Sequence, residues 1–158
     1  MNATILSAVF TKDDILTIAL SNGNQMDLCI TPSLGCAELL RLKDKGVQKS
    51  LNVQEGCLCW EDAPPLFISG LLSLLRATNS KCAITCASAG DDWRLSLRFQ
   101  NGSSLSIEME PLLEYSVFAP LVQSSLWKTL QAKENSLLWE DESIRLELPI
   151  ETILRYFV

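Results

Sequence analysis

The sequence contains no histidine, and this absence removes much of the chemistry on which enzymes depend. Ser-His-Asp and Cys-His activation of a nucleophile both need an imidazole, and so do the zinc sites that use histidine ligands. The 7 glycines are scattered, mostly at predicted turns, and form no glycine-rich phosphate loop. Cysteine, carboxylate and lysine chemistry remain, but no nucleophile has a visible base beside it. The sequence therefore predicts no catalytic residue and no cofactor.

Long apolar runs and a concentrated basic face are missing as well. A membrane helix needs about 20 consecutive apolar residues, whereas the longest run, over residues 66–75, is interrupted by a glycine and two serines. Binding a nucleic-acid backbone needs clustered cations, whereas the net charge is −6 and the one basic run, over residues 41–49, is broken by Asp44. We expect neither membrane nor nucleic acid as a partner. Because the first residues carry no basic, signal-like segment, we also expect a cytoplasmic location.

A repeat is the strongest feature that the 158 residues contain. Adding 79 to a position in the first half often gives the same residue type in the second half. The matched segments are Asn22-Gly23 with Asn101-Gly102, Pro32 with Pro111, Leu34 with Leu113, Leu75 with Leu154, and Trp60-Glu61-Asp62 with Trp139-Glu140-Asp141. For Asp13-Asp14 and Asp91-Asp92 the offset is 78, so we expect one residue to have been inserted or lost between the first two strands.

The repeat predicts two tandem modules, the first at residues 1–76 and the second at 82–158. The linker between them, at 77–81, is short and polar. Because a connection of this length leaves little reach, we expect the two modules to pack together with pseudo-twofold symmetry.

Each half shows the same order of secondary-structure signals. Apolar and polar residues alternate before and after each Asn-Gly pair, which is typical of two half-buried strands joined by a tight turn. The other expected elements are a first strand (5–10, 83–89), short helices (38–42, 47–51, 117–122, 126–130), a strand (58–60, 137–139) and a closing helix (68–75, 149–157). The predicted fold class is α+β, in which each module has a three-stranded antiparallel meander, short helices, a β-hairpin or strand, and a closing helix.

These motifs resemble those of the bacterial family DUF2442, a domain of unknown function. The matching stretches are Leu20-Ser21-Asn22-Gly23 and Phe99-Gln100-Asn101-Gly102, with Trp60 and Trp139 before the last helix. Members of that family have about the size of one half, so the resemblance covers nearly the whole chain, twice. Members usually carry an Asp just after the tryptophan, where both halves have Trp-Glu-Asp. The resemblance implies a module without catalysis, and it transfers no catalytic residue.

The cysteines are candidates for a metal site. Cys57, Cys59, Cys82 and Cys86 could supply four thiolates, but zinc ligands usually come in pairs about two to four residues apart on turns. The matching positions in the other half hold Ser, Leu or Ala, so we interpret most thiols as small apolar fillers. Cys29, whose counterpart is a glutamate, is expected to be the exposed thiol.

Glu61-Asp62 and Glu140-Asp141-Glu142 form an acidic constellation found in both halves. Paired carboxylates could hold a divalent cation or act as acid and base. Neighbouring residues on a strand point to opposite faces, however, and do not converge. A solvated turn, or a position near a helix cap, is the preferred interpretation, and the sequence predicts no metal ion.

The tryptophans divide into two classes. Trp60 and Trp139 occupy matching positions and are expected to be core anchors. The other two tryptophans have an aspartate and a glutamine as counterparts, so the fold does not require an aromatic ring there, and an unrequired tryptophan is an interface candidate. The apolar chain end is another. The interface candidates are Trp93, Trp127, Tyr156 and Phe157.

The leading hypothesis is a non-enzymatic protein-interaction or regulatory module with an unidentified protein partner, and a homodimer stays open. The alternative is a small-ligand or metal-binding protein that uses the region 140–142 or the cysteines. The weakest alternative is a hydrolase or transferase of unrecognised type.

Overall fold

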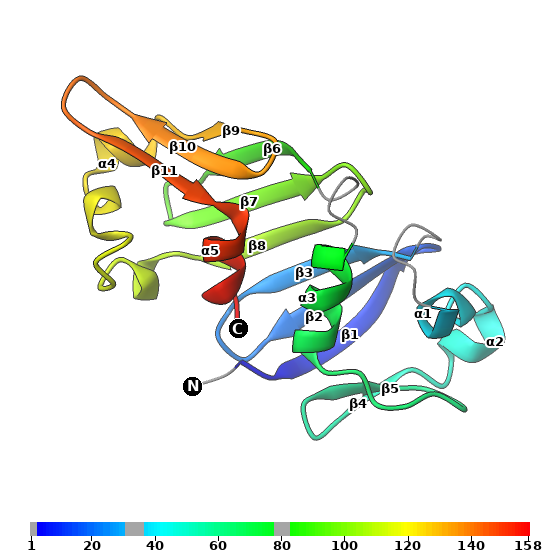
Figure 1. The fold of residues 1–158 in the computed structure, drawn as a ribbon. Helices are drawn as coiled ribbons and strands as arrows, with labels where there is room; N and C mark the ends of the chain where they lie inside the picture. The colour runs from blue at the N-terminus through cyan, green and yellow to red at the C-terminus, as the bar shows by residue number, and fades with distance from the viewer. Residues whose placement is uncertain (1–2, 31–36, 78–82) are drawn as a thin grey trace.

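The protein has an α+β fold built on a six-stranded antiparallel sheet (Figure 1). The computed structural model describes residues 3–30, 37–77 and 83–158. Each half of the chain supplies three strands, in the order β1-β2-β3-β8-β7-β6, so that β3 and β8 pair at the centre. The strands are β1 (Ile5–Lys12), β2 (Ile15–Leu20), β3 (Gln25–Cys29), β6 (Ile84–Ala89), β7 (Arg94–Phe99) and β8 (Ser104–Glu108).

The sheet follows from the alternation of residues along its strands. In β7 the side chains of Leu95, Leu97 and Phe99 are buried, and the residues between them face the other side of the sheet. The turns that follow β2 and β7 place Gly23 and Gly102 at φ values of 83° and 88°, which glycine adopts without a steric penalty. The two predicted hairpins are confirmed.

The register between β3 and β8 is centred on matching positions of the two halves. Its centre is the pair Met26 and Leu105, and these positions are 79 residues apart. At the two ends of the pairing, a side chain from each half receives a backbone N–H of the other half. Asn24 Oδ1 accepts from Glu108 N (2.8 Å), and Ser103 Oγ accepts from Cys29 N (3.0 Å). A twofold relation between the halves would give this register, while the duplication itself stays a prediction.

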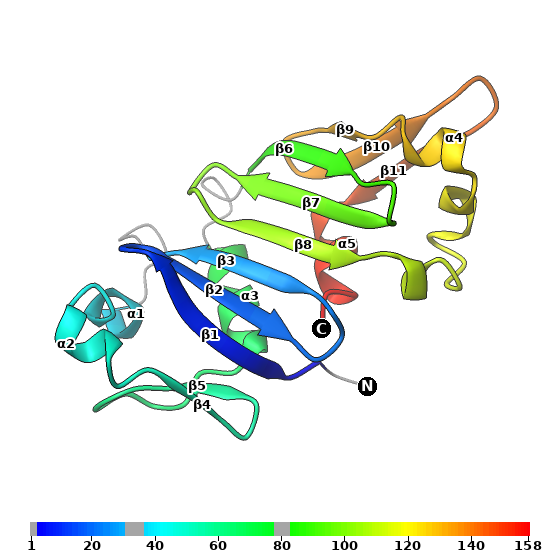
Figure 2. The same cartoon turned by 180° about the vertical axis from the view of Figure 1, so that it is seen from behind.

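One face of the sheet is covered and the other is not. Helices α3 (Ile68–Ala77) and α5 (Ile150–Arg155) lie against one face. Figure 2 shows the opposite face, over which no described element lies. Leu71 and Ile153 of these helices are buried in one core with the apolar side chains of the sheet. Within the described ranges, no helix is long and apolar enough to cross a membrane.

Short elements lie around the edges of the sheet. Next to β1 is the hairpin β4–β5, and near β6 is a second sheet with the order β11-β10-β9. These strands are β4 (Asn52–Gln54), β5 (Cys57–Cys59), β9 (Gln131–Ala132), β10 (Ser136–Glu140) and β11 (Arg145–Pro149). The short helices are α1 (Ala37–Arg41), α2 (Lys45–Gln48), η2 (Glu110–Leu112), η3 (Ala119–Val122) and α4 (Ser124–Trp127).

Two expectations are wrong. The closing helix predicted at 149–157 begins at Ile150 and ends at Arg155, because the preceding residues form β11, which pairs with β10. The expected insertion between the first two strands is also absent. Phe10 pairs with Leu16 and Ala89 pairs with Leu95, so the connections have equal length and the Asp-Asp pair is only shifted by one position within them.

Some predicted features fall on parts of the chain that the structure does not describe. Pro32, Leu34, Cys82 and residues 78–81 of the predicted linker lie outside the described residues.

Candidate functional site

Two of the predicted interface residues belong to the core. Trp127 is only 2% exposed, and its Nε1 donates a hydrogen bond to the Gly90 carbonyl oxygen (2.8 Å). Its ring lies 5.4 Å from that of Trp93 and 6.3 Å from that of Trp139, measured between centroids. Phe157 is fully buried. The expectation that Trp127 and Phe157 present their rings to a partner is wrong, because both rings already have neighbours in the same chain.

The other two interface candidates are half-buried. Trp93 contributes to the aromatic cluster around Trp127 and has a φ of 58°, a left-handed backbone conformation that is uncommon for a bulky residue. Tyr156 packs against the exposed ring of Tyr115, with centroids 5.0 Å apart. Their role at an interface stays a prediction.

Trp60 and Trp139 are buried, as expected for core anchors. The indole N–H of each has no hydrogen-bond partner among the described residues. The rings therefore contribute through apolar burial rather than through a polar contact.

The described cysteines do not gather into a metal centre. Within the part of the chain that the structure describes, no three of the His, Cys, Asp and Glu side chains come together as metal ligands. Cys57 and Cys59 are neighbours, with their Sγ atoms 3.9 Å apart on β5. The expectation for Cys29 is wrong. It is 7% exposed, and burial raises the pKa of its thiol, whereas Cys86 is the exposed one of the four cysteines that the structure describes.

The second acidic segment forms the turn between β10 and β11. Asp141 Oδ1 accepts hydrogen bonds from the backbone N–H groups of Ser143 and Ile144, both at 2.8 Å. These bonds lower the pKa of the Asp141 carboxyl. Glu140 points elsewhere and contacts Arg145 (3.3 Å). The Asp141 carboxylate stabilises the turn, and the Glu140 carboxylate pairs with Arg145 on the neighbouring strand. The two carboxylates do not converge on a common point.

We expect the Asp141 turn to loosen as the pH falls through the depressed pKa of this residue. A carboxyl whose pKa is lower in the folded state stabilises that state above its unfolded pKa, and acidification removes this contribution. A carbon-detected NMR titration of Asp141 should give a midpoint below the ordinary carboxyl value, and the Ile144 amide should exchange faster at the acid end. Asp141→Asn, which keeps the acceptor oxygen, should show no such pH dependence. A raised midpoint for Asp141 would contradict the expectation.

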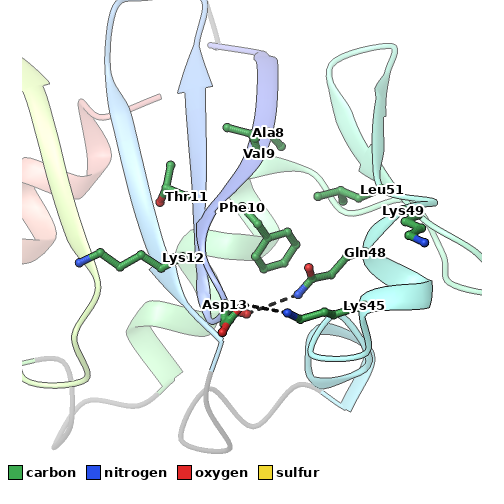
Figure 3. Close-up of a pocket in the computed structure, with 10 residues that line it drawn as sticks. All are labelled: Ala8, Val9, Phe10, Thr11, Lys12, Asp13, Lys45, Gln48, Lys49 and Leu51. Atoms are coloured by element: carbon green, nitrogen blue, oxygen red, sulfur yellow. Dashed lines mark hydrogen bonds and ion pairs between the residues drawn. The ribbon is translucent and has the colours of Figure 1, made fainter.

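A groove of about 550 Å³ lies between β1 and α2. Its lining residues are Ala8, Val9, Phe10, Thr11, Lys12, Asp13, Lys45, Gln48, Lys49 and Leu51. Figure 3 shows the Phe10 ring and the Leu51 side chain pointing into the space, while Lys45 and Gln48 point toward Asp13. This volume lies within the range of about 300–1,000 Å³ that is usual for ligand sites.

One wall of this groove is the outer edge of a strand. β1 is the last strand of the six-stranded sheet and pairs on one side with β2. On its other side, Ile5 N donates to Gly56 O (3.2 Å) at the start of the strand, and the groove begins further along, at Ala8. Val9 in this stretch is 56% exposed. An exposed strand edge is a template for pairing with another extended chain.

The other wall carries positive charge. Lys45 and Lys49 come from α2 and its end, and Lys12 extends from β1 on the side away from α2 (Figure 3). Asp13 is the one acidic residue of the lining, and its Oδ1 lies 3.4 Å from Lys45 Nζ. Both side chains are mostly exposed, so this ion pair contributes only about 0–1 kcal/mol and can be exchanged for contacts with a ligand.

The corresponding place in the second half is occupied by the chain itself. Gln48 and Trp127 are 79 residues apart, as are Thr11 and Gly90. In the second half, the Trp127 indole lies beside the end of β6 and donates to the Gly90 carbonyl. In the first half, Gln48 Nε2 instead donates to Leu42 O (2.7 Å) and Asp13 O (3.4 Å). The smaller amide leaves the groove open.

The uncovered sheet face is the weaker candidate. A second hollow of about 300 Å³ lies there, lined by residues of β3, β6, β7 and β8 that include four serines. Asp27, one of the lining residues, already accepts hydrogen bonds from Thr17 Oγ1 (2.8 Å) and Ser104 Oγ (3.2 Å). Because these hydrogen bonds already engage both oxygens of the Asp27 carboxylate, this acidic group is less available to a ligand.

Trp127 was the predicted interface residue, and Gln48 occupies the matching position in the first half. In the structure Trp127 is buried, and the groove lies at Gln48. The signal was the difference in side-chain size between two matching positions. No family model, no curated protein and no solved structure matches this chain, so the resemblance to DUF2442 stays a prediction.

Proposed function

We propose that the protein is a non-enzymatic interaction module that binds an extended segment of a partner protein along β1. The observation that carries this proposal is the groove itself, which has a volume of about 550 Å³ and lies between the exposed edge of β1 and helix α2. Strand addition gives affinity through main-chain hydrogen bonds and specificity through pockets for alternate side chains. Here β1 supplies the edge, and Phe10 and Leu51 supply an apolar pocket.

A displayed library of random short peptides, selected on the full chain, tests the proposal. We expect enriched peptides whose binding slows hydrogen exchange of the β1 amides. Gln48→Trp should abolish their binding, because an indole at this position fills the groove as Trp127 fills its counterpart. Gln131→Trp is the matched control, because it adds the same ring at an exposed position of β9 in the other half.

The control variant should bind the selected peptides as the unchanged protein does. Peptides that bind the Gln48→Trp variant equally well, or that protect amides outside β1, would reject the groove as the site. A selection without enrichment would count against strand addition itself.

A further inference from the structure

We propose that the partner segment places a tryptophan side chain, flanked by acidic residues, in the groove between β1 and α2. This inference rests on the proposed function and specifies the ligand of the same site. Its basis is the second half of the chain, where an indole already occupies the corresponding place beside β6.

The contacts of Trp127 indicate what the groove accepts. Its ring is buried beside an edge strand, and its N–H donates to a carbonyl at the end of that strand, Gly90 O. The residue of the first half that corresponds to Gly90 is Thr11, which belongs to the groove lining. A partner indole in the same orientation buries its apolar body against Phe10 and Leu51. Its single N–H donor then points at the edge of β1.

The apolar lining fits this occupant. Phe10 and Leu51 are half-buried and pack against the main core, so they form a firm floor rather than a mobile surface. Aromatic anchors that enter such a pocket commonly supply most of the binding free energy of an interface. A small polar side chain would leave this floor exposed to water.

The charge of the groove indicates which residues flank the tryptophan of the partner segment. On the α2 side the lining carries Lys45 and Lys49, and Asp13 is its one acidic residue, in a protein whose net charge is −6. Acidic side chains on the partner can pair with Lys45 and Lys49 and displace Asp13 from Lys45. A second copy of this chain is the less suitable occupant, because the same edge of that copy would bring its own lysines toward these ones.

Fluorescence anisotropy with three labelled peptides tests the proposal. The first probe alternates valine with glutamate around a central tryptophan, the second has alanine in place of the tryptophan, and the third has lysine in place of the glutamates. The full chain should bind the first probe. The alanine probe should bind roughly thirtyfold more weakly or worse, as expected for loss of a buried aromatic anchor.

Charge reversal on the protein completes the test. The double variant Lys45→Glu/Lys49→Glu should lose about tenfold in affinity for the glutamate probe and should prefer the lysine probe. Both lysines are exposed, so the variant should fold normally, which its circular dichroism spectrum would establish.

The outcomes separate this inference from the proposed function. If the Gln48→Trp variant fails to bind the probes while the alanine or lysine probe binds the unchanged protein as well as the first does, the groove binds peptides but the ligand assignment is wrong. If no probe binds, the ligand assignment also fails, and the library selection still tests strand addition. If Gln48→Trp leaves binding of the first probe unchanged, both proposals fail.

Discussion

Trp127→Ala should lower the free energy of unfolding by about 3–5 kcal/mol, the range for removing a large aromatic side chain from a core. Trp127 is 2% exposed and packs between the rings of Trp93 and Trp139. Truncation leaves a cavity among these rings and removes the donor that now serves the Gly90 carbonyl. Urea denaturation of the full chain, followed by circular dichroism, measures the difference.

Gln48→Ala is the matched control for this variant, because the two positions are 79 residues apart. Gln48 is half-buried at the groove, and its amide makes hydrogen bonds to loop carbonyls. Losing them should cost about 1 kcal/mol. A Trp127→Ala variant as stable as the Gln48→Ala control would return Trp127 to the surface and make it an interface candidate again. The Gln48→Trp experiments would then lose their structural basis.

Asn24→Ala should lower the free energy of unfolding by roughly 2–4 kcal/mol, because Glu108 N loses its buried acceptor and Phe157 O loses one of two amide donors, keeping Asn22 Nδ2 (3.0 Å). The Asn24 amide is 3% exposed and joins three parts of the chain. Its Oδ1 accepts from Glu108 N (2.8 Å), and its Nδ2 donates to Phe157 O (2.7 Å). Alanine can replace neither contact. Hydrogen exchange of the Glu108 amide should become faster, and urea denaturation should show the loss of stability.

Ser103→Ala provides the comparison, since Ser103 is the residue 79 positions after Asn24 and is also buried. Its Oγ accepts one backbone N–H, that of Cys29 (3.0 Å), so one group is left without a partner. Its cost should be about 1–3 kcal/mol, less than that of Asn24→Ala. If Ser103→Ala lowered the free energy of unfolding more than Asn24→Ala does, the contact of Asn24 with the chain end at Phe157 would contribute nothing to stability.

The α+β class and the strand hairpins could be predicted because their causes are local. Period-two alternation fixes which residues face the core, and an Asn-Gly pair fixes the turn. Strand β11 was missed because Pro149 was taken as the start of a helix, whereas it ends the strand that pairs with β10. A proline at the end of an edge strand disturbs no pairing, so it did not exclude a strand.

The candidate site could not be predicted, since it depends on tertiary neighbours. The groove exists because helix α2 lies apart from the edge strand β1. No local sequence pattern determines the distance between these two elements. Burial of Trp127 had the same origin. Sequence comparison between the halves identified the position as unusual, but it could not tell which of the two residues departed from a shared arrangement. The buried polar pair Asn24 and Ser103 also gave no signal, since asparagine and serine are common in turns.

The register at the centre of the sheet has a consequence for how such a protein can be assembled. A chain that ended before β6 would keep β3 but expose its edge. In the intact protein the second half supplies the backbone N–H of Glu108 and the side-chain oxygen of Ser103 to this pairing. The half-length chain has Cys29 at the position that matches Glu108 and Asn24 at the position that matches Ser103, so a second copy of it would supply a backbone N–H and a side-chain oxygen at the same places. Two such chains could therefore associate isologously through β3, with Met26 of one chain beside Met26 of the other. The covalent connection would then convert a concentration-dependent dimer into a single folding unit.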